Sequence, residues 1–146
     1  MTWIHLEVLT VERTVLSSDV HTIVLPTVEG EISVLPGHVP LVSMLKPGAL
    51  IARSDDEEHY LAVSGGFVQV TPAFVTVLAD ACEHAEEIDV LRAEEAKARA
   101  KRLLEERGPE VDVATAEAAL RRAIARLSVA ERQRRRRRHV PHRPSF

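Results

Sequence analysis

Apolar and polar residues alternate along the first half of the chain with the period of a half-buried β-strand. In the segment IHLEVL, Ile4, Leu6 and Val8 alternate with polar residues, as they do when one face of a strand is buried. Similar short runs follow, namely VHTIVL, EISVL, HYLAV, FVQV and FVTVLA, and they are separated by Pro-Gly, Gly-Gly and acidic turn sequences. Strands of this length and spacing predict a β-sandwich or a barrel over residues 1–87, and the sandwich is the fold class we adopt.

The pattern changes to helical spacing at about residue 88. Apolar residues then recur every three or four positions in two stretches that Gly108-Pro109 separates. Asp89 and Asp112 are suitable N-cap residues at the two helix starts. We therefore predict an antiparallel two-helix hairpin over residues 88–133, so that the fold class is mainly β plus α. The apolar stripes are narrow and rich in alanine, which suits either a weakly held, mobile element or simply close helix packing.

Charge divides the chain at the same place. Residues 1–88 carry 3 Lys/Arg against 13 Asp/Glu, a net charge of −10, whereas residues 89–146 carry 16 against 9, a net charge of +7. Two modules with different partners are expected from this asymmetry. Residues 134–146 begin with five consecutive arginines and lack apolar periodicity. Because like charges repel, we expect a disordered, Arg-rich tail there.

Sequence motifs give no support for catalysis. The chain has no phosphate-binding G-x-x-x-x-G-K-[ST] loop and no G-x-S-x-G nucleophile elbow. Cys82 is its single cysteine, and the seven histidines show no metal-ligand spacing. No apolar run is long enough for a membrane span, and the N-terminus does not resemble a secretory signal. We predict a non-catalytic protein with no metal site and no required cofactor.

Four arginines of the hairpin fall at positions that could share one seam. Arg92 and Arg99 are seven residues apart on the first helix, and Arg122 and Arg126 are four apart on the second. Folding the hairpin about Gly108-Pro109 would place Arg92 opposite Arg126 and Arg99 opposite Arg122. Guanidinium groups bind phosphate through paired hydrogen bonds. A triphosphate could then convert their repulsion into attraction and hold the hairpin closed.

Several motifs raise a family resemblance. The segments EGEISVLPGHVPLVSMLKPGAL, VSGGFVQV and VTVLADACEHAEEID, taken in order over residues 1 to about 130, are similar to the epsilon subunit of the bacterial F-type ATP synthase. The resemblance implies a rotor subunit at the foot of the central stalk that helps to couple proton-driven rotation to ATP synthesis. The sandwich would dock on the gamma subunit and the membrane c-ring. The hairpin would extend toward the alpha/beta catalytic head and inhibit ATP hydrolysis.

The same resemblance implies a location and a contact region. The chain would lie peripherally on the cytoplasmic face of the bacterial membrane and contact that membrane only through the complex. A stiff loop costs little ordering entropy at an interface, so we expect rotor contact within residues 31–45. The residues chosen there are Glu31, Leu35, Pro36, Gly37, His38, Pro40 and Leu41.

Some epsilon subunits bind ATP through an I/L-D-x-x-R-A motif, which Ile88, Asp89, Arg92 and Ala93 match here. By this resemblance Asp89 would accept a hydrogen bond from the adenine amino group, and arginines would hold the phosphates. Additional candidates are Glu83, Arg99, Arg122 and Arg126. ATP would then be a regulatory ligand that favours the folded hairpin.

Two alternatives stay open at this stage. The arginines could instead be solvated and paired along their helices, as in Glu95–Arg99 and Glu117–Arg121, or they could meet acidic groups on the catalytic head. From another class, the Arg-rich tail could make the chain a nucleic-acid-binding protein. Against that, the sandwich is acidic and only 3% of residues are aromatic, so we expect no nucleic acid partner.

Overall fold

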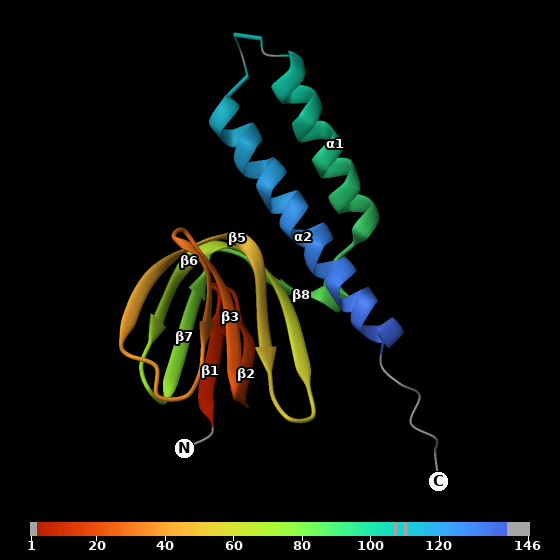
Figure 1. Ribbon diagram of the computed structural model, residues 1–146. Helices are drawn as coiled ribbons and strands as arrows, with labels where there is room; N and C mark the ends of the chain where they lie inside the picture. Colours follow the sequence, from red (N-terminus) through yellow and green to blue (C-terminus); the bar gives the residue numbers. More distant parts are fainter. Residues whose placement is uncertain (1–2, 107, 110, 140–146) are drawn as a thin grey trace.

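Eight strands form the first part of the computed structural model, which describes residues 3–106, 108–109 and 111–139 (Figure 1). Hydrogen bonds join the strands in the order β2-β1-β7-β6-β5-β3-β4, and β8 pairs with β6. β1 and β7 are parallel, and the other pairs are antiparallel. The strands are β1 (Ile4–Leu9), β2 (Thr14–Val20), β3 (Thr22–Thr27), β4 (Gly30–Val34), β5 (Leu41–Arg53), β6 (Glu58–Val70), β7 (Phe74–Ala79) and β8 (Cys82–His84).

The two long strands β5 and β6 take part in both layers of the sandwich. The second half of β6 pairs with β7, whereas its first half pairs with β8. Gly65 and Gly66 lie between these two halves and have φ values of +103° and +124°. A Cβ on Gly66 would lie 2.1 Å from the backbone oxygen of Leu78. Only glycine therefore allows β6 to change partners so close to β7.

The predicted sandwich is confirmed, and its core contains the alternating residues that the sequence pattern singled out. Ile4, Leu6 and Val8 of β1 are fully buried. They pack with apolar residues of β2 to β7 in one continuous cluster. Burial of such side chains stabilises the fold by about 1.5–3 kcal/mol each, so the sandwich has a substantial core of its own.

Two helices follow the sandwich after a short 3-10 turn, η1 (Ala85–Glu87). They are α1 (Val90–Glu106) and α2 (Val113–His139), and both begin as predicted. A carboxylate oxygen of Asp89 accepts the backbone N–H of Arg92 at 3.1 Å, and one of Asp112 accepts that of Thr115 at 3.2 Å. Both aspartates are therefore N-caps.

The seam between the helices differs from the expected row of four arginines. Its buried residues are alanines, namely Ala93 and Ala100 on α1 with Ala116 and Ala123 on α2. Small side chains let the two backbones approach closely, whereas four uncompensated guanidinium groups at the same place would repel one another. The alanine stripes thus form the helix contact itself.

The end of α2 rests on the sheet, and the loop end of the hairpin projects away from it (Figure 1). Val129 of α2 is fully buried in a second apolar cluster with Ala62, Ala85 and Ile88. This cluster lies outside the sandwich core, against β5 and β6. The hairpin is thereby held to the sheet through α2, while α1 packs on α2.

We predicted a disordered tail from residue 134. This prediction is wrong for residues 134–139, because α2 continues to His139. Arginine is a good helix former, and the repulsion between neighbours is offset by carboxylates. Arg135 pairs with Glu131 at 2.8 Å, and Arg136 pairs with Glu58 of β6. The remaining part of the expected tail, residues 140–146, lies outside the described residues.

Candidate functional site

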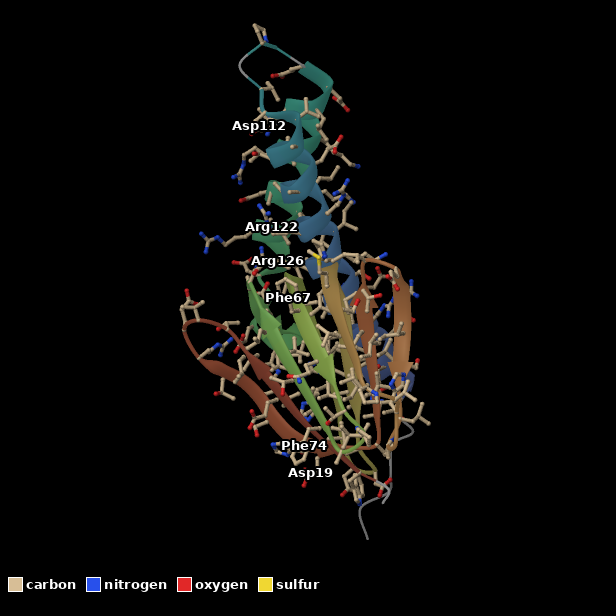
Figure 2. The ribbon with its side chains drawn as sticks, turned by 90° about the vertical axis from the view of Figure 1, so that its left-hand side faces the viewer. Asp19, Phe67, Phe74, Asp112, Arg122 and Arg126 are labelled. Carbon is tan, nitrogen blue, oxygen red and sulfur yellow. The ribbon has the colours of Figure 1, made fainter. Side chains whose placement is uncertain are left out.

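The junction between the hairpin and the sheet brings together two of the predicted ligand residues. Arg126 of α2 donates through Nε to the carboxylate of Glu83 on β8, and both side chains are about one-quarter exposed. The two residues are 43 positions apart in sequence. Figure 2 shows Arg126 where α2 reaches the sheet, one turn beyond Arg122. This ion pair joins α2 to β8.

Three further candidates have structural roles in this conformation. Ile88 packs beneath α2 in the cluster with Val129, and Ala93 is fully buried. Asp89 is exposed, and its carboxylate caps α1. An exposed capping carboxylate keeps lone pairs available for a second partner. The I/L-D-x-x-R-A motif therefore lies at the junction between the sheet and the hairpin.

The other three arginines are not gathered into one cluster. Arg92, Arg99 and Arg122 are all exposed, and none has an ion-pair partner within the described part of the chain. Arg99 borders a hollow of about 350 Å³ between the helices, beside Ala100 and Thr115. The alternative interpretation was that arginines pair with glutamates along their own helices. Of the two ion pairs named for it, Glu117–Arg121 is present at 3.7 Å.

A second link across the junction was not predicted. Arg13, in the turn between β1 and β2, donates two hydrogen bonds to the carboxylate of Glu87 in η1, at 3.1 and 2.7 Å. The hydrogen bond from Arg13 lowers the pKa of Glu87, and the same bond raises the pKa of Arg13. Paired bonds of this kind set direction as well as distance. Sequence reasoning could not find a pair that is 74 positions apart.

The predicted rotor-contact residues fall on two surfaces. The turn that contains Pro36 and His38 projects Leu35 into solvent, and Gly37, with φ of +84°, donates its N–H to the Pro72 oxygen at 2.9 Å. Pro40 beyond it is exposed, and Leu41 packs against the core. Glu31 lies elsewhere, in a groove of about 450 Å³ beside α2. The turn thus lies where the sequence placed it, and Glu31 is not part of it. Rotor contact by these residues stays a prediction.

An exposed apolar face next to this turn escaped the sequence analysis. Met44, Phe67 and Leu78 occupy neighbouring strands in direct register, and they are 53%, 52% and 55% exposed. Val42 and Phe74 are also exposed nearby on β5 and β7, and Figure 2 shows Phe67 and Phe74 toward opposite ends of these strands. Contiguous exposed apolar side chains mark interaction surfaces. In the sequence this face is indicated by apolar residues at both odd and even positions along a strand, as in LVSML and FVTVL.

The chemistry available in the described residues is that of binding. No group of His, Cys, Asp and Glu within them could hold a metal ion. Cys82 is partly buried, and burial raises the pKa of its thiol to about 12, which disfavours the nucleophilic thiolate. Among the helices described, none combines the length and the apolar character that crossing a membrane requires.

Two family models match consecutive parts of the chain, which together cover residues 3–131. Residues 3–85 match the ATP synthase Delta/Epsilon chain beta-sandwich domain, and residues 86–131 match the ATP synthase Delta/Epsilon chain long alpha-helix domain. The ATP synthase epsilon chain of Dehalococcoides mccartyi is 47% identical over 92% of this chain and 96% of its own length. That of Moorella thermoacetica is 47% identical over 89% and 98%.

Solved structures agree with these matches. A chain of the Euglena gracilis mitochondrial ATP synthase superposes with a TM-score of 0.77 at 26% identity, over 86% of this chain and 79% of that one. A chain from the central stalk and c-ring structure of the Tetrahymena thermophila mitochondrial ATP synthase has a TM-score of 0.58 at 14% identity, over 89% and 95%. The second likeness concerns the fold alone.

Proposed function

This chain belongs to the Delta/Epsilon family of ATP synthase subunits, and from that premise we propose how its two parts work in the rotor. It is an epsilon chain, a non-catalytic subunit of the F-type ATP synthase central stalk. The sandwich docks on the gamma subunit and the c-ring and passes proton-driven rotation to ATP synthesis. The hairpin opposes ATP hydrolysis when it extends toward the alpha/beta head. Both actions take place at the cytoplasmic face of a bacterial membrane.

The exposed apolar face carries the docking proposal. Met44, Phe67 and Leu78 form a row across β5, β6 and β7, and the hairpin contacts β5 and β6 in their other halves, through Ala49 and Tyr60. The row therefore stays accessible while the hairpin is folded. Apolar side chains exposed to this extent gain free energy when a partner covers them, at about 25 cal/mol per Å².

Substitution of this row tests the docking proposal. The variants Phe67→Gln and Leu78→Gln should each weaken binding to the gamma subunit of the same synthase by about tenfold or more, because each loses part of the buried apolar area. Leu91→Gln is the matched control, since Leu91 is 68% exposed and lies on α1, outside the sandwich. Equal binding by all four proteins in calorimetric titration would reject this face as the docking surface.

The fold supports hairpin mobility through the size of its contacts. Beyond the ion pairs, α2 is held to the sheet by a small cluster in which Ala62, Ala85 and Val129 are the buried members beside Ile88. Alanine contributes little area, so the junction is weaker than the sandwich core. An element that must leave its docking surface needs such low local stability.

ATP is the ligand we propose for the folded hairpin. The support is the matching motif at the hinge, the exposed carboxylate of Asp89 and the exposed guanidinium groups of Arg92, Arg99 and Arg122. Glu83 and Arg126 would belong to the same site through their mutual contact. Ile88 and Ala93 would shape it by packing. ATP that binds only this arrangement would shift the population toward it.

Calorimetric titration with ATP separates ligand and capping roles of Asp89. Asp89→Asn keeps a good N-cap and removes the charge, whereas Asp89→Ala removes both. ATP binding should fall in both variants and in Arg92→Ala, and it should persist in Asp112→Ala, which loses an equivalent cap at the other helix. No heat from the unsubstituted protein at millimolar ATP would reject the site and leave the arginines to meet the catalytic head.

A further inference from the structure

The extended end of α2 forms a second basic surface that neither the docking nor the ATP proposal uses. A hollow of about 410 Å³ lies between the last turns of α2 and the paired ends of β5 and β6. The family match ends at residue 131, so the helical side of this hollow lies beyond it. We call this hollow the arginine cavity, and it is lined by Ile51, Arg53, Tyr60, Arg132, Arg135 and Arg136.

Helical spacing places these arginines on the side of α2 that faces the sheet. Arg132 and Arg136 follow the fully buried Val129 at three and seven positions, which is the spacing of one helix face. Both arginines are exposed and line the hollow together with Ile51 and Tyr60. The methylene stems of the arginines and the tyrosine ring can give such a site apolar support, while the guanidinium groups remain accessible.

The lining of the cavity holds four guanidinium groups and no carboxylate. Glu58, with a side chain only 5% exposed, accepts Arg53 Nε at 2.6 Å and also pairs with Arg136. Glu131 pairs with Arg135 at 2.8 Å. The acidic turn between β5 and β6 adjoins the cavity, and two of its carboxylates lie beside His21 and His59. Arg132 has no ion-pair partner among the described residues, so its donors are available in a hollow large enough for several non-hydrogen atoms.

We propose that the arginine cavity binds a phosphate-bearing anion with at least two negative charges. Arg132 and Arg53 supply paired donors to its oxygens, and the Tyr60 hydroxyl is a further donor. The bound anion bridges β5 and α2, because Arg53 lies on the strand and Arg132 on the helix. Occupancy therefore holds the last turns of α2 on the sheet, independently of the hinge at Asp89.

Titration of the full chain with pyrophosphate tests this proposal. The double variant Arg53→Gln/Arg132→Gln should bind at least tenfold more weakly. The control Lys97→Gln/Arg102→Gln removes the same charge from α1 and should bind like the unsubstituted protein. Circular dichroism and thermal unfolding show that each variant is folded, and single Arg132→Gln provides a milder change that keeps the Arg53–Glu58 pair.

Amide hydrogen exchange gives a second measurement, because nonspecific electrostatic binding of pyrophosphate would not slow exchange in one segment alone. Pyrophosphate should slow amide exchange in residues 129–139 of the unsubstituted protein and not in the double variant. Vesicles of phosphatidylglycerol and of phosphatidylcholine distinguish the source of the phosphate. Binding to the acidic vesicles that pyrophosphate displaces identifies a lipid headgroup, and pyrophosphate binding without vesicle binding identifies a free anion.

Three results would overturn the proposal. The first is no binding of pyrophosphate by the unsubstituted protein at millimolar concentration. The second is equal weakening in the double variant and the control, which would mean that net charge decides. The third is DNA binding that survives loss of Arg53 and Arg132 in a protein that ignores pyrophosphate, because the arginine run would then act as a nucleic-acid contact.

Discussion

Arg126 on the second helix and Glu83 on the last short strand form an ion pair that joins the helical hairpin to the sandwich. Neither side chain is fully exposed to solvent, so this ion pair contributes more to stability than a fully exposed pair does. Its position beside Val129 means that a single helical turn carries both the apolar and the ionic contact of the junction. Substitution of the ion pair is therefore a suitable way to test how firmly the hairpin is held on the sheet.

Reversal of one partner should release the hairpin. In Arg126→Glu two carboxylates face each other, and we expect the docked state to lose about 1–2 kcal/mol. Amide exchange in residues 125–139 should accelerate by about 5- to 30-fold, while exchange in β1 and β7 stays unchanged. The double variant Arg126→Glu/Glu83→Arg should regain most of the protection. If the double variant exchanges as fast as the single one, the pair does not hold the junction.

Among the glycines of the sandwich, substitution of Gly66 should cause the largest loss in the free energy of unfolding. Gly66→Ala combines a positive φ with a Cβ 2.1 Å from the Leu78 oxygen, so we expect a loss of about 3–5 kcal/mol in the free energy of unfolding. Gly30→Ala is the control, since its φ of +123° is nearly the same and its Cβ meets nothing within 4 Å. That variant should lose about 1–2 kcal/mol. Urea denaturation measures both, and equal losses would show that the close approach is unimportant.

Acid should weaken the link between Arg13 and Glu87. The pKa of Glu87 is lowered in the folded state, so its contribution is present above the unfolded pKa of about 4.3 and disappears as pH falls through the folded value. Glu87→Gln should therefore flatten the decline in stability below about pH 4.3. Denaturation at pH 3, 4 and 7 measures this, with Glu94→Gln on the exposed side of α1 as the control. An unchanged pH profile in Glu87→Gln would contradict the assignment.

Cys82 should be unreactive at neutral pH. Burial raises its pKa to about 12, so at pH 8 the thiolate fraction is far below that of an ordinary cysteine, and reaction with a disulfide reagent should be more than about a hundredfold slower than in urea. A raised pKa also means that this thiol stabilises the fold below about pH 8.5 and that the contribution is lost as pH rises toward 12. Rapid labelling of the native protein at pH 8 would refute this.

The sequence pattern correctly predicted those features that depend on neighbouring residues alone. The strand alternation beginning at Ile4 and the two capping aspartates, Asp89 and Asp112, depend only on neighbouring residues, and the structure confirms them. The partner of Arg126 could not be found in this way, because it depends on where α2 crosses β8. The helical state of the arginines after residue 133 was missed for the same reason, since Glu58 is distant in sequence.

The apolar face shows a different limit of sequence reasoning. Met44 and Leu78 read as strand residues, and strand periodicity identifies the buried face only when the other face is polar. Here both faces of β5 and β7 carry apolar residues, so the pattern could not say which side lies in the core. That ambiguity is itself informative, because a strand that is apolar on both sides needs a second partner for its outer face.

The unequal attachment of the two helices has a mechanical consequence. Because α1 is held through α2 and leaves the sandwich at a short hinge, loss of the α2 contacts would free the whole hairpin as one lever. At a rise of 1.5 Å per residue the 17 residues of α1 span about 25 Å from the sheet to the loop end of the hairpin. A swing of about 20° at the start of α1 would carry that loop end through about 9 Å. Small shifts at the sheet would thus become large displacements at the far tip of the hairpin.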